Sequence, residues 1–459
     1  MSVFSLSNLK KTWYYLQKNG IRNAVWAVLE RIGQEQEVYT WQEPDEKTLS
    51  FQREHSASLR ISIVVPAYRT KKEHLEAMLN SVSRQSYPHW ELIVADAGGT
   101  AESVQAWAKK NGICLRKAAD ASNLAEWMDQ SIMLCTLSEN KGISANTNAG
   151  IELAAGDAVG LLDHDDLLTA NALWEMADCL EKEKKRGKQK LVLFSDEDKC
   201  DGAASRFYEP NFKPDFDGEL LLTNNYICHF TVIETAFLKE LKLRSGFDGA
   251  QDYDLMLRAY AAGGQFVHVP KVLYHWRCHE ASTASNPQSK RYAYEAGQRA
   301  LEDYCLRKGW KATVSGLKHL GFYREDYEDS VFCQRPEIGI WAKPLPGGRD
   351  VFGIRHPKGF LVSGLYENDG SMRYAGLRKG YSGPMHRAAL QQSAPAADLR
   401  SMEVCSALKE RYAQTIAELK EACQGLSTAA QETKILQKSM EFCKEATAAG
   451  YGILWDPQA

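Results

Sequence analysis

Residues 156–169 read GDAVGLLDHDDLLT, an apolar run that ends in a group of carboxylates. The run 159–162 has the composition of a buried strand, and Asp163, Asp165 and Asp166 follow it. Carboxylates held together by the backbone repel one another, so at neutral pH the group must be exposed, partly protonated or neutralised by a cation. The stretch therefore predicts a strand that leads into an acidic, cation-binding loop.

Strand-type and helix-type segments alternate around this loop. Strands are expected over 61–68, 90–96, 157–163 and 191–198, and helices over 74–85, 143–155 and 171–185. This alternation predicts an α/β fold around a largely parallel sheet. Ligands of such sheets bind beyond the carboxyl ends of the strands, where Asp96, Asp163 and Asp196 are expected to converge.

The composition is that of a globular protein of more than one domain. The 459 residues are 44% hydrophobic and 25% charged, and the net charge of −3 argues against broad nucleic-acid binding. The 11 cysteines form no CxxC pair, which is typical of reduced thiols in the cytosol. No apolar run approaches the roughly 18 residues of a membrane span, and the start lacks a signal-peptide core. A cytoplasmic location is expected.

Changes of composition divide the chain into four segments. Residues 1–58 combine aromatic and basic side chains at helical spacing, which predicts an amphipathic helical segment. Such a segment can lie peripherally on the inner face of the cytoplasmic membrane or pack on the main domain. The main domain is expected over 59–324, and the Pro- and Gly-rich residues 325–350 predict a linker.

Residues 351–459 are expected to form a smaller α+β module. One stretch of this module is a faint repeat of a stretch in the main domain. AAGYGILWDP at 448–457 aligns with AAGGQFVHVP at 261–270, and Ser439 then stands opposite Asp252. Each stretch follows an amphipathic helix, so chance similarity of two helix-turn-strand units is the alternative to a true repeat.

The acidic loop suits Mg²⁺ or Mn²⁺, which prefer oxygen ligands and leave positions open for phosphate oxygens. The alternative is that Asp165 or Asp166 caps the following helix. After the first strand, Pro66, Ala67 and Tyr68 offer backbone groups and an aromatic face to a nucleobase. These residues are also compatible with simple packing.

Three further polar positions fit a nucleotide site. Asp96 can accept a hydrogen bond from a pyrimidine imide, or it can serve the turn before the Gly-Gly pair that follows. Residues 271–277, read as a strand, place His275 and Arg277 on one face. If that face meets a diphosphate, His275 is a third metal ligand and Arg277 a phosphate contact, although a lone histidine on a strand is more often structural.

Asp252 is the candidate general base. Attack by a hydroxyl needs a proton acceptor opposite the departing group, and a carboxylate at the start of a helix is aimed rigidly. The alternatives are a capping role for Asp252 and a catalytic role for Asp254.

Taken in order, these stretches resemble the nucleotide-sugar-dependent glycosyltransferases of the GT-A fold, sequence family two. The resemblance spans residues 60–310 and is carried by SIVVPAY (62–68), WELIVADAGGT (90–100), ENKGISANTNAGIELAAGDAVGLLDHDD (139–166), FSDEDK (194–199), GAQDYDLMLRAYAAGG (249–264) and VPKVLYHWRCHEASTA (269–284). It is most similar to the bacterial branch that builds O-antigen and capsule polysaccharides. It implies a GT-A, Rossmann-like domain, followed here by a degenerate half domain of the same kind.

The resemblance also implies roles for individual residues. The nucleotide is expected near Pro66, Ala67, Tyr68, Asp96, Asn148, Asp163 and Arg277, the donor sugar near Asp196 and Glu197, the metal at Asp163, Asp165 and His275, and the base at Asp252. Asp165 is the expected direct metal ligand. Two positions depart from the family pattern, because Thr147 replaces a frequent arginine and Gln251 a frequent glutamate.

The resemblance predicts an inverting hexosyl- or deoxyhexosyltransferase that uses Mn²⁺ or Mg²⁺. Its donor is a nucleoside-diphosphate sugar, and its acceptor is a glycan or lipid-linked glycan. A nucleotidyltransferase is less compatible, because the loop 66–74 lacks glycines. A catalytically silent scaffold subunit is the other alternative. The C-terminal module shows no second acidic motif, so it is expected to pack on the main domain or to recognise the acceptor.

Overall fold

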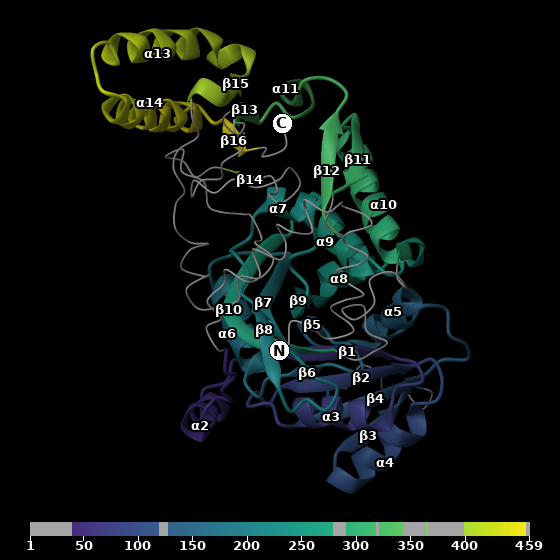
Figure 1. Ribbon diagram of the computed structural model, residues 1–459. Helices are drawn as coiled ribbons and strands as arrows, with labels where there is room; N and C mark the ends of the chain where they lie inside the picture. Colours follow the sequence, from purple (N-terminus) through teal and green to yellow (C-terminus); the bar gives the residue numbers. More distant parts are fainter. Residues whose placement is uncertain are drawn as a thin grey trace, which may run out of the picture. The chain divides into compact units, whose positions relative to one another are not determined.

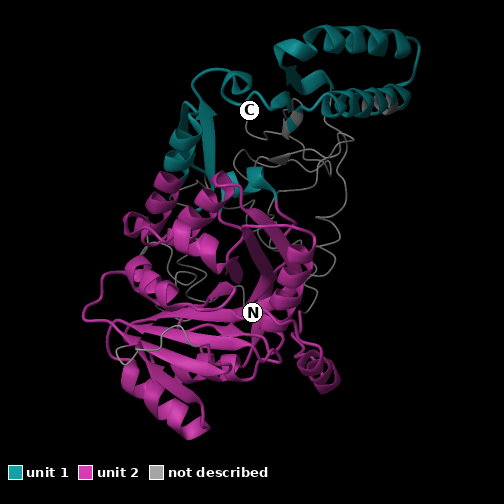
Figure 2. Ribbon diagram, turned by 180° about the vertical axis from the view of Figure 1, so that it is seen from behind, with its two compact units in different colours: residues 1–37, 217–224, 301–459 teal, residues 38–216, 225–300 magenta. Residues whose placement is uncertain are grey.

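The computed structural model describes residues 39–118, 127–278, 291–317, 321–342, 364–365 and 399–455 (Figure 1). The chain forms two compact units (Figure 2). The main unit comprises residues 38–216 and 225–300, and the C-terminal unit comprises residues 1–37, 217–224 and 301–459. The segment boundaries expected from the sequence stay predictions.

The main unit is built on a ten-stranded sheet. In spatial order the strands are β3 (Cys114–Lys117), β4 (Ser131–Thr136), β2 (Trp90–Asp96), β1 (Ile61–Ala67), β5 (Ala158–Leu161), β9 (Thr231–Glu234), β7 (Leu191–Cys200), β10 (Gln265–Arg277) and β6 (Leu167–Leu168), and β8 (Phe207–Asn211) pairs with β7. The strands from β3 to β5 run parallel, whereas β9 is antiparallel to both of its neighbours. The predicted α/β fold with a mostly parallel sheet is confirmed.

Helices flank this sheet. They are α2 (Glu46–Glu54), α3 (Lys72–Ser83), α4 (Ala101–Asn111), α5 (Ile143–Leu153), α6 (Ala172–Lys185), α8 (Thr235–Leu241), the 3₁₀ turn η2 (Ser245–Phe247) and α9 (Gln251–Ala261). Alternate side chains of β1 point to opposite faces. Ile63 and Val65 belong to one buried cluster with Leu75 of α3, whereas Val64 meets α5 at Gly150. The sheet is therefore buried on both sides, as its continuous apolar strands require.

The C-terminal unit has a smaller sheet and its own core. Its elements are α7 (Gly218–Thr223), the part of α10 (Arg291–Lys308) from Leu301 onward, β11 (Ala312–Gly316), β12 (Tyr323–Tyr327), α11 (Val331–Gln334), β13 (Ile338–Ala342), β14 (Gly364–Leu365), η4 (Leu399–Ser401), β15 (Met402–Val404), η5 (Ser406–Leu408), α13 (Lys409–Ala422), α14 (Thr428–Ala448) and β16 (Gly452–Trp455). Four strands pair in the order β14-β16-β13-β15. The segment expected as a linker thus contains β13, because Ile338 and Ile340 are buried between its prolines.

The two aligned stretches have the same helix-turn-strand form. Residues 261–270 lead from α9 into β10, and residues 448–455, the described part of the second stretch, lead from α14 into β16. Gly263 and Gly450 follow the helix ends with φ of +78° and +89°, a conformation that favours glycine. Ser439, opposite Asp252 in the alignment, is buried. Since many unrelated helices end in this way, the half-domain interpretation stays a prediction.

No helix in the described part of the chain is long and apolar enough to cross a membrane. The expected membrane contact of residues 1–58 rests largely on residues 1–38, which lie outside the described residues. That contact stays a prediction.

Candidate functional site

The acidic loop lies at one edge of the main sheet. β1, β2 and β5 run parallel, so the residues after Ala67, Asp96 and Leu161 meet at the same edge. β9 runs the other way and pairs Thr231 with Leu161, so the residues before β9 reach this edge as well. The strand ends that carry Asp96 and Asp163 therefore lie at one edge, and His229, two residues before β9, reaches it as well. Asp196 lies within β7 (Leu191–Cys200) rather than at its carboxyl end, so its expected convergence with the other two stays a prediction.

The first strand end presents an aromatic ring. Pro66 and Ala67 close β1, and Tyr68 follows with 39% of its surface exposed. The Arg69 guanidinium lies 5.1 Å from the ring centroid, and a Cβ at Gly98 would lie 3.6 Å from the ring. Tyr68 is therefore accessible for stacking, and nucleobase binding by these residues stays a prediction.

Asp96 is buried at the end of β2. Its carboxylate accepts hydrogen bonds from the backbone N–H groups of Gly98, Thr100 and Ala101, at 3.0, 3.3 and 2.8 Å. These bonds fix the turn into α4. The turn-forming alternative for Asp96 is thus present in the structure, and a contact with a nucleobase is untested.

Asn148 ties α5 to the loop that precedes α9. Its Nδ2 donates to the carbonyl of Leu243 at 2.8 Å, and its Oδ1 accepts from the Leu243 N–H at 2.9 Å. Both ends of the amide are used in this clamp. Asn148 therefore positions the route to α9, and the expected diphosphate contact stays a prediction.

The three carboxylates of the acidic loop differ in how far they are exposed to solvent. The side chains of Asp163 and Asp165 are 43% and 24% exposed, whereas Asp166 is buried. Asp166 accepts hydrogen bonds from the Tyr274 hydroxyl at 2.6 Å and the Arg277 backbone N–H at 2.7 Å. Burial, together with the charges of Asp165 and Asp163, raises the pKa of Asp166 well above its ordinary value. Asp166 is a structural residue, whereas Asp163 and Asp165 are partly exposed, and their role as metal ligands stays a prediction.

Asp252 stands in the first turn of α9, near the acidic loop. Its Oδ2 accepts a hydrogen bond from Asn225 Nδ2 at 2.9 Å, and its Oδ1 accepts from the Tyr253 N–H. Partial withdrawal from water raises the pKa of Asp163, and the charges of Asp165 and Asp252 add to that effect, so Asp252 and Asp163 are within electrostatic reach of each other. The structure thus brings the candidate base and the candidate metal loop together.

Asp254, the alternative base, has a different environment. Its side chain is 1% exposed and forms ion pairs with Arg244 and Arg258. A carboxylate enclosed by two guanidinium groups is held for structure rather than for proton transfer. Asp252 is therefore the better candidate of the two.

β10 places Tyr274 and His275 on opposite faces. Tyr274 faces the acidic loop, whereas His275 Nδ1 lies 2.5 Å from Asp198 Oδ1, with the rings of Trp41 and Phe207 beside it. The structure does not bring His275 to the two candidate metal ligands. A ligand role for His275 stays a prediction that requires its side chain to leave Asp198.

Arg277 lies against the acidic loop and is buried. Its Nε donates to the carbonyl of Asp165, and its Nη1 donates to the carbonyl of Gly202 at 2.7 Å. Nη2 is buried and has no hydrogen-bond partner among the described residues. The predicted phosphate contact is untested, and Nη2 is the atom that could make it.

The two expected donor-sugar residues are engaged inside the protein. Asp196 Oδ1 accepts from the Lys213 backbone N–H at 2.9 Å and lies 2.8 Å from His268 Nε2. Glu197 Oε2 accepts from the His229 backbone N–H at 2.7 Å and lies 3.2 Å from His229 Nδ1. Burial raises the pKa of Glu197, but Lys213 and His229 outweigh it and hold the value at about 2. Glu197 is thus a charged anchor for His229.

His229 is a site residue that the sequence motifs do not indicate. Its Nε2 lies 3.9 Å from Asp163 Oδ2, and its ring stacks on Tyr274 with centroids 5.0 Å apart. Burial lowers the pKa of His229, but Glu197 and Asp163 raise it to about 9. The available signal was a histidine just before the short strand TVIE at 231–234, and this signal locates His229 only once the direction of that strand is known.

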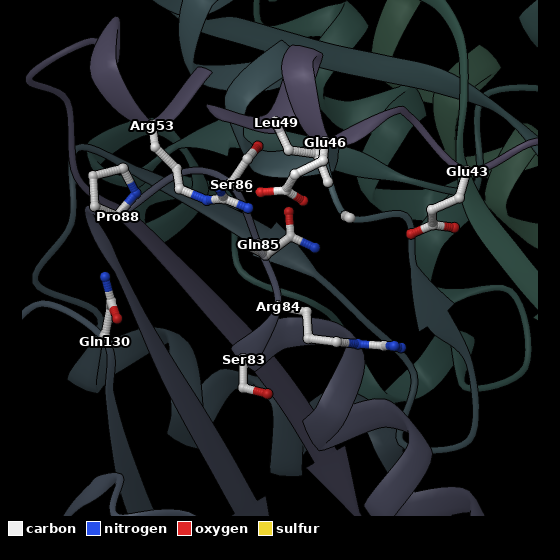
Figure 3. A pocket seen from close by; sticks show the side chains of 11 residues that line it. Glu43, Glu46, Leu49, Arg53, Ser83, Arg84, Gln85, Ser86, Pro88 and Gln130 are labelled. Atoms are coloured by element: carbon white, nitrogen blue, oxygen red, sulfur yellow. Dashed lines mark hydrogen bonds and ion pairs between the residues drawn. The ribbon is translucent and has the colours of Figure 1, made fainter. Parts of the chain in front are cut away.

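A separate pocket of about 600 Å³ lies between α2 and the segment that joins α3 to β2 (Figure 3). It is lined by Glu43, Glu46, Leu49, Arg53, Ser83, Arg84, Gln85, Ser86, Pro88, Gln130 and Ala170. Because this segment precedes β2, the pocket lies at the amino ends of the parallel strands, opposite to the acidic loop. None of the predicted site residues lines it.

The mostly parallel sheet, with an acidic loop beyond its strand ends, defines the main unit as a GT-A-type domain. Residues 62–241 match the family described as Glycosyl transferase family 2. Residues 62–241 are therefore similar to glycosyltransferase family 2, as the sequence motifs predicted. The matched range includes the acidic loop and Glu197, whereas Asp252 and Arg277 lie beyond it.

Individual proteins are similar over about half of the chain. O-antigen biosynthesis protein RfbC of Myxococcus xanthus is 34% identical over 256 residues, which are 56% of this chain and 19% of RfbC. Amylovoran biosynthesis glycosyltransferase AmsB of Erwinia amylovora is 27% identical over 231 residues, which are 47% of this chain and 70% of AmsB. The chain thus spans only about a fifth of the length of RfbC.

Solved structures of S. aureus TarS are also similar. The crystal structure of TarS residues 1–349 in complex with UDP-GlcNAc shares 20% identity and a TM-score of 0.41, over 54% of this chain and 67% of that chain.

Proposed function

We propose that the chain is an inverting glycosyltransferase. It moves a hexosyl or deoxyhexosyl group from a nucleoside-diphosphate sugar to a hydroxyl of a glycan or lipid-linked glycan in cell-surface polysaccharide synthesis. The observation that supports the proposal is that Asp252 lies within electrostatic reach of Asp163, whereas the neighbouring Asp254 is enclosed by arginines. The family 2 domain and the names of RfbC and AmsB support the class of substrate.

Mn²⁺ or Mg²⁺ fits the residues of the acidic loop. Asp163 and Asp165 offer two partly exposed carboxylates, and Mg²⁺ commonly takes one or two protein carboxylates and completes its shell with phosphate oxygens and water. Among the described residues, no group of three Cys, His, Asp or Glu side chains is arranged to hold a metal. A pair of carboxylates suits a cation that binds together with the donor diphosphate, and the cation would stabilise the charge that develops on the diphosphate.

The protein groups supply the remaining chemistry. Asp252 accepts the proton of the attacking hydroxyl while that oxygen bonds to the anomeric carbon and the bond to the diphosphate breaks. A single displacement of this kind inverts the anomeric carbon. Asn225 fixes the carboxylate through its hydrogen bond, and Arg277 Nη2 is available to the departing phosphate.

Turnover of nucleotide sugars tests this function. The purified chain is incubated with a panel of UDP-, dTDP- and GDP-sugars and lipid-linked glycan acceptors, with and without Mn²⁺, and released nucleoside diphosphate is measured. Cation-dependent release from one donor is expected, with at least about a hundredfold loss in Asp165→Ala. Tight binding of a donor without any release would instead favour a silent scaffold subunit.

A further inference from the structure

His229 is held in place through its backbone and through its ring. Its backbone N–H and its Nδ1 both face Glu197 Oε2, and its carbonyl accepts a hydrogen bond from the buried Lys213 Nζ. Its ring stacks on Tyr274 at an interplanar angle of 14°. Because an ionised carboxylate only accepts, Nδ1 is the nitrogen that carries the proton toward Glu197. The ring atom that remains for a ligand is Nε2.

Nε2 points toward Asp163 across a gap. The distance of 3.9 Å to Asp163 Oδ2 is too long for a direct hydrogen bond. An oxygen atom roughly 2.8 Å from each of the two groups would bridge them. A hydroxyl suits this position because it both donates and accepts, whereas a phosphate oxygen only accepts and is repelled by the carboxylate.

The position of this gap identifies which hydroxyl would enter it. Asp163 is within electrostatic reach of Asp252, the proposed base, which must lie next to the anomeric carbon of the donor. The nucleoside is expected at the ends of β1 and β2, near Tyr68 and Asp96. The gap therefore belongs to the transferred sugar rather than to the ribose.

We propose that His229 Nε2 and Asp163 together bind a hydroxyl of the transferred sugar, which makes His229 a specificity-determining residue for the donor. This inference rests on the proposed function, because it assumes a nucleotide-sugar donor. Glu197 then acts through His229 as a positioning residue. Both oxygens of Glu197 are already occupied, by His229 and by Asn211 Nδ2 at 3.3 Å.

Two substitutions at position 229 separate the contact from the scaffold. In His229→Asn the amide can still reach Glu197, as Nδ1 does, but nothing occupies the place of Nε2. In His229→Gln the longer amide reaches toward that place. His89→Gln is the control, because His89 precedes β2 at the opposite edge of the sheet and pairs with Asp129.

The measurement is calorimetric binding of two probes in the presence of Mn²⁺: the nucleotide sugar that wild type binds most tightly in the panel, and its nucleoside diphosphate. His229→Asn should weaken nucleotide-sugar binding about tenfold or more and change nucleoside diphosphate binding by less than about twofold. His229→Gln should lose less, and His89→Gln should match wild type. Equal weakening of both probes, or no change in either, would overturn the inference.

A second measurement covers the case in which His229→Asn does not fold. Wild type and His229→Gln are compared on donors that each lack one sugar hydroxyl. Loss of the bridged hydroxyl should cost wild type about tenfold in affinity and the variant much less. If no hydroxyl is coupled to residue 229, the inference fails while the proposed function stands. If wild type binds no nucleotide sugar at all, the proposed function itself fails.

Discussion

At the scale of single residues, carboxylates close together in the sequence have opposite environments. Asp252 and Asp254 begin the same helix, yet the first accepts an amide hydrogen bond near the acidic loop and the second is enclosed by Arg244 and Arg258. Asp163 is partly exposed, whereas Asp166 is buried. In each pair one carboxylate maintains the local structure, and the other is the one we propose for chemistry.

Asp254→Asn tests this division. The substitution removes the negative charge between two arginines and leaves Arg258, whose side chain is 10% exposed, without its carboxylate. The free energy of unfolding should fall by about 3 kcal/mol, in the range for breaking a buried ion pair. Urea unfolding of the variant measures it, with Asp252→Asn as the matched control, which should lose less than about 1 kcal/mol. Equal losses in both would contradict the division.

At the scale of elements, α5 approaches β1 closely because residue 150 lacks a side chain. A Cβ at Gly150 would lie 2.6 Å from Val64 Cγ1, inside contact distance. Gly150→Ala should therefore lower the free energy of unfolding by about 1–3 kcal/mol through overpacking. Gly202→Ala is the control, because nothing lies within 4 Å of a Cβ there. Denaturant unfolding of both variants measures the change. An unchanged free energy of unfolding in Gly150→Ala would show that α5 can shift to make room for the methyl group.

The hairpin of β11 and β12 carries a partly buried acidic group, Glu325, beside an ion pair. Arg335 forms two hydrogen bonds with Glu219, at 2.6 and 2.7 Å, and Oε1 of Glu325 is buried with no hydrogen-bond partner among the described residues. Burial, with the charge of Glu219, raises the pKa of Glu325 to about 8. The folded state therefore holds a proton at Glu325 that the unfolded state releases near pH 4.5.

This difference predicts a pH dependence of stability. Between roughly pH 4.5 and pH 8 the folded state binds more protons than the unfolded state, so the free energy of unfolding should fall as the pH rises. Glu325→Gln, which is neutral at all pH values, should flatten this decline by about 1–2 kcal/mol. Unfolding of both proteins at several pH values measures it, with exposed Glu328→Gln as the control. An unchanged slope in Glu325→Gln would argue against a protonated Glu325.

The local elements of the main unit could be predicted from the sequence, because period and turn residues are local signals. The acidic loop could be predicted as well, because a strand that ends in carboxylates is visible in residues 159–166. The role of His229 could not be predicted, because it depends on β9 entering the sheet antiparallel to β5. Alternation along β10 separated Tyr274 from His275, but tertiary packing decided which face meets the loop.

At the scale of the whole molecule, each unit has a core of its own. Val94 belongs to the cluster of the main unit, and Phe442 to a cluster of the C-terminal unit. Phe442→Ala should lower the stability of its unit by about 3–5 kcal/mol, and Val94→Ala should lower that of the main unit. Scanning calorimetry is expected to show the two variants moving different transitions. A single transition that both variants shift equally would contradict separate cores.

We propose that the edge of the sheet around Asp163 transfers a sugar with Asp252 as the base. Single-turnover transfer and donor binding by Asp252→Asn, in the presence of Mn²⁺, test it most directly. Donor affinity should stay within about twofold of wild type, whereas the transfer rate should fall at least about a hundredfold, because the attacking hydroxyl loses its proton acceptor. Transfer at a rate near that of wild type would contradict the role of Asp252 as the base.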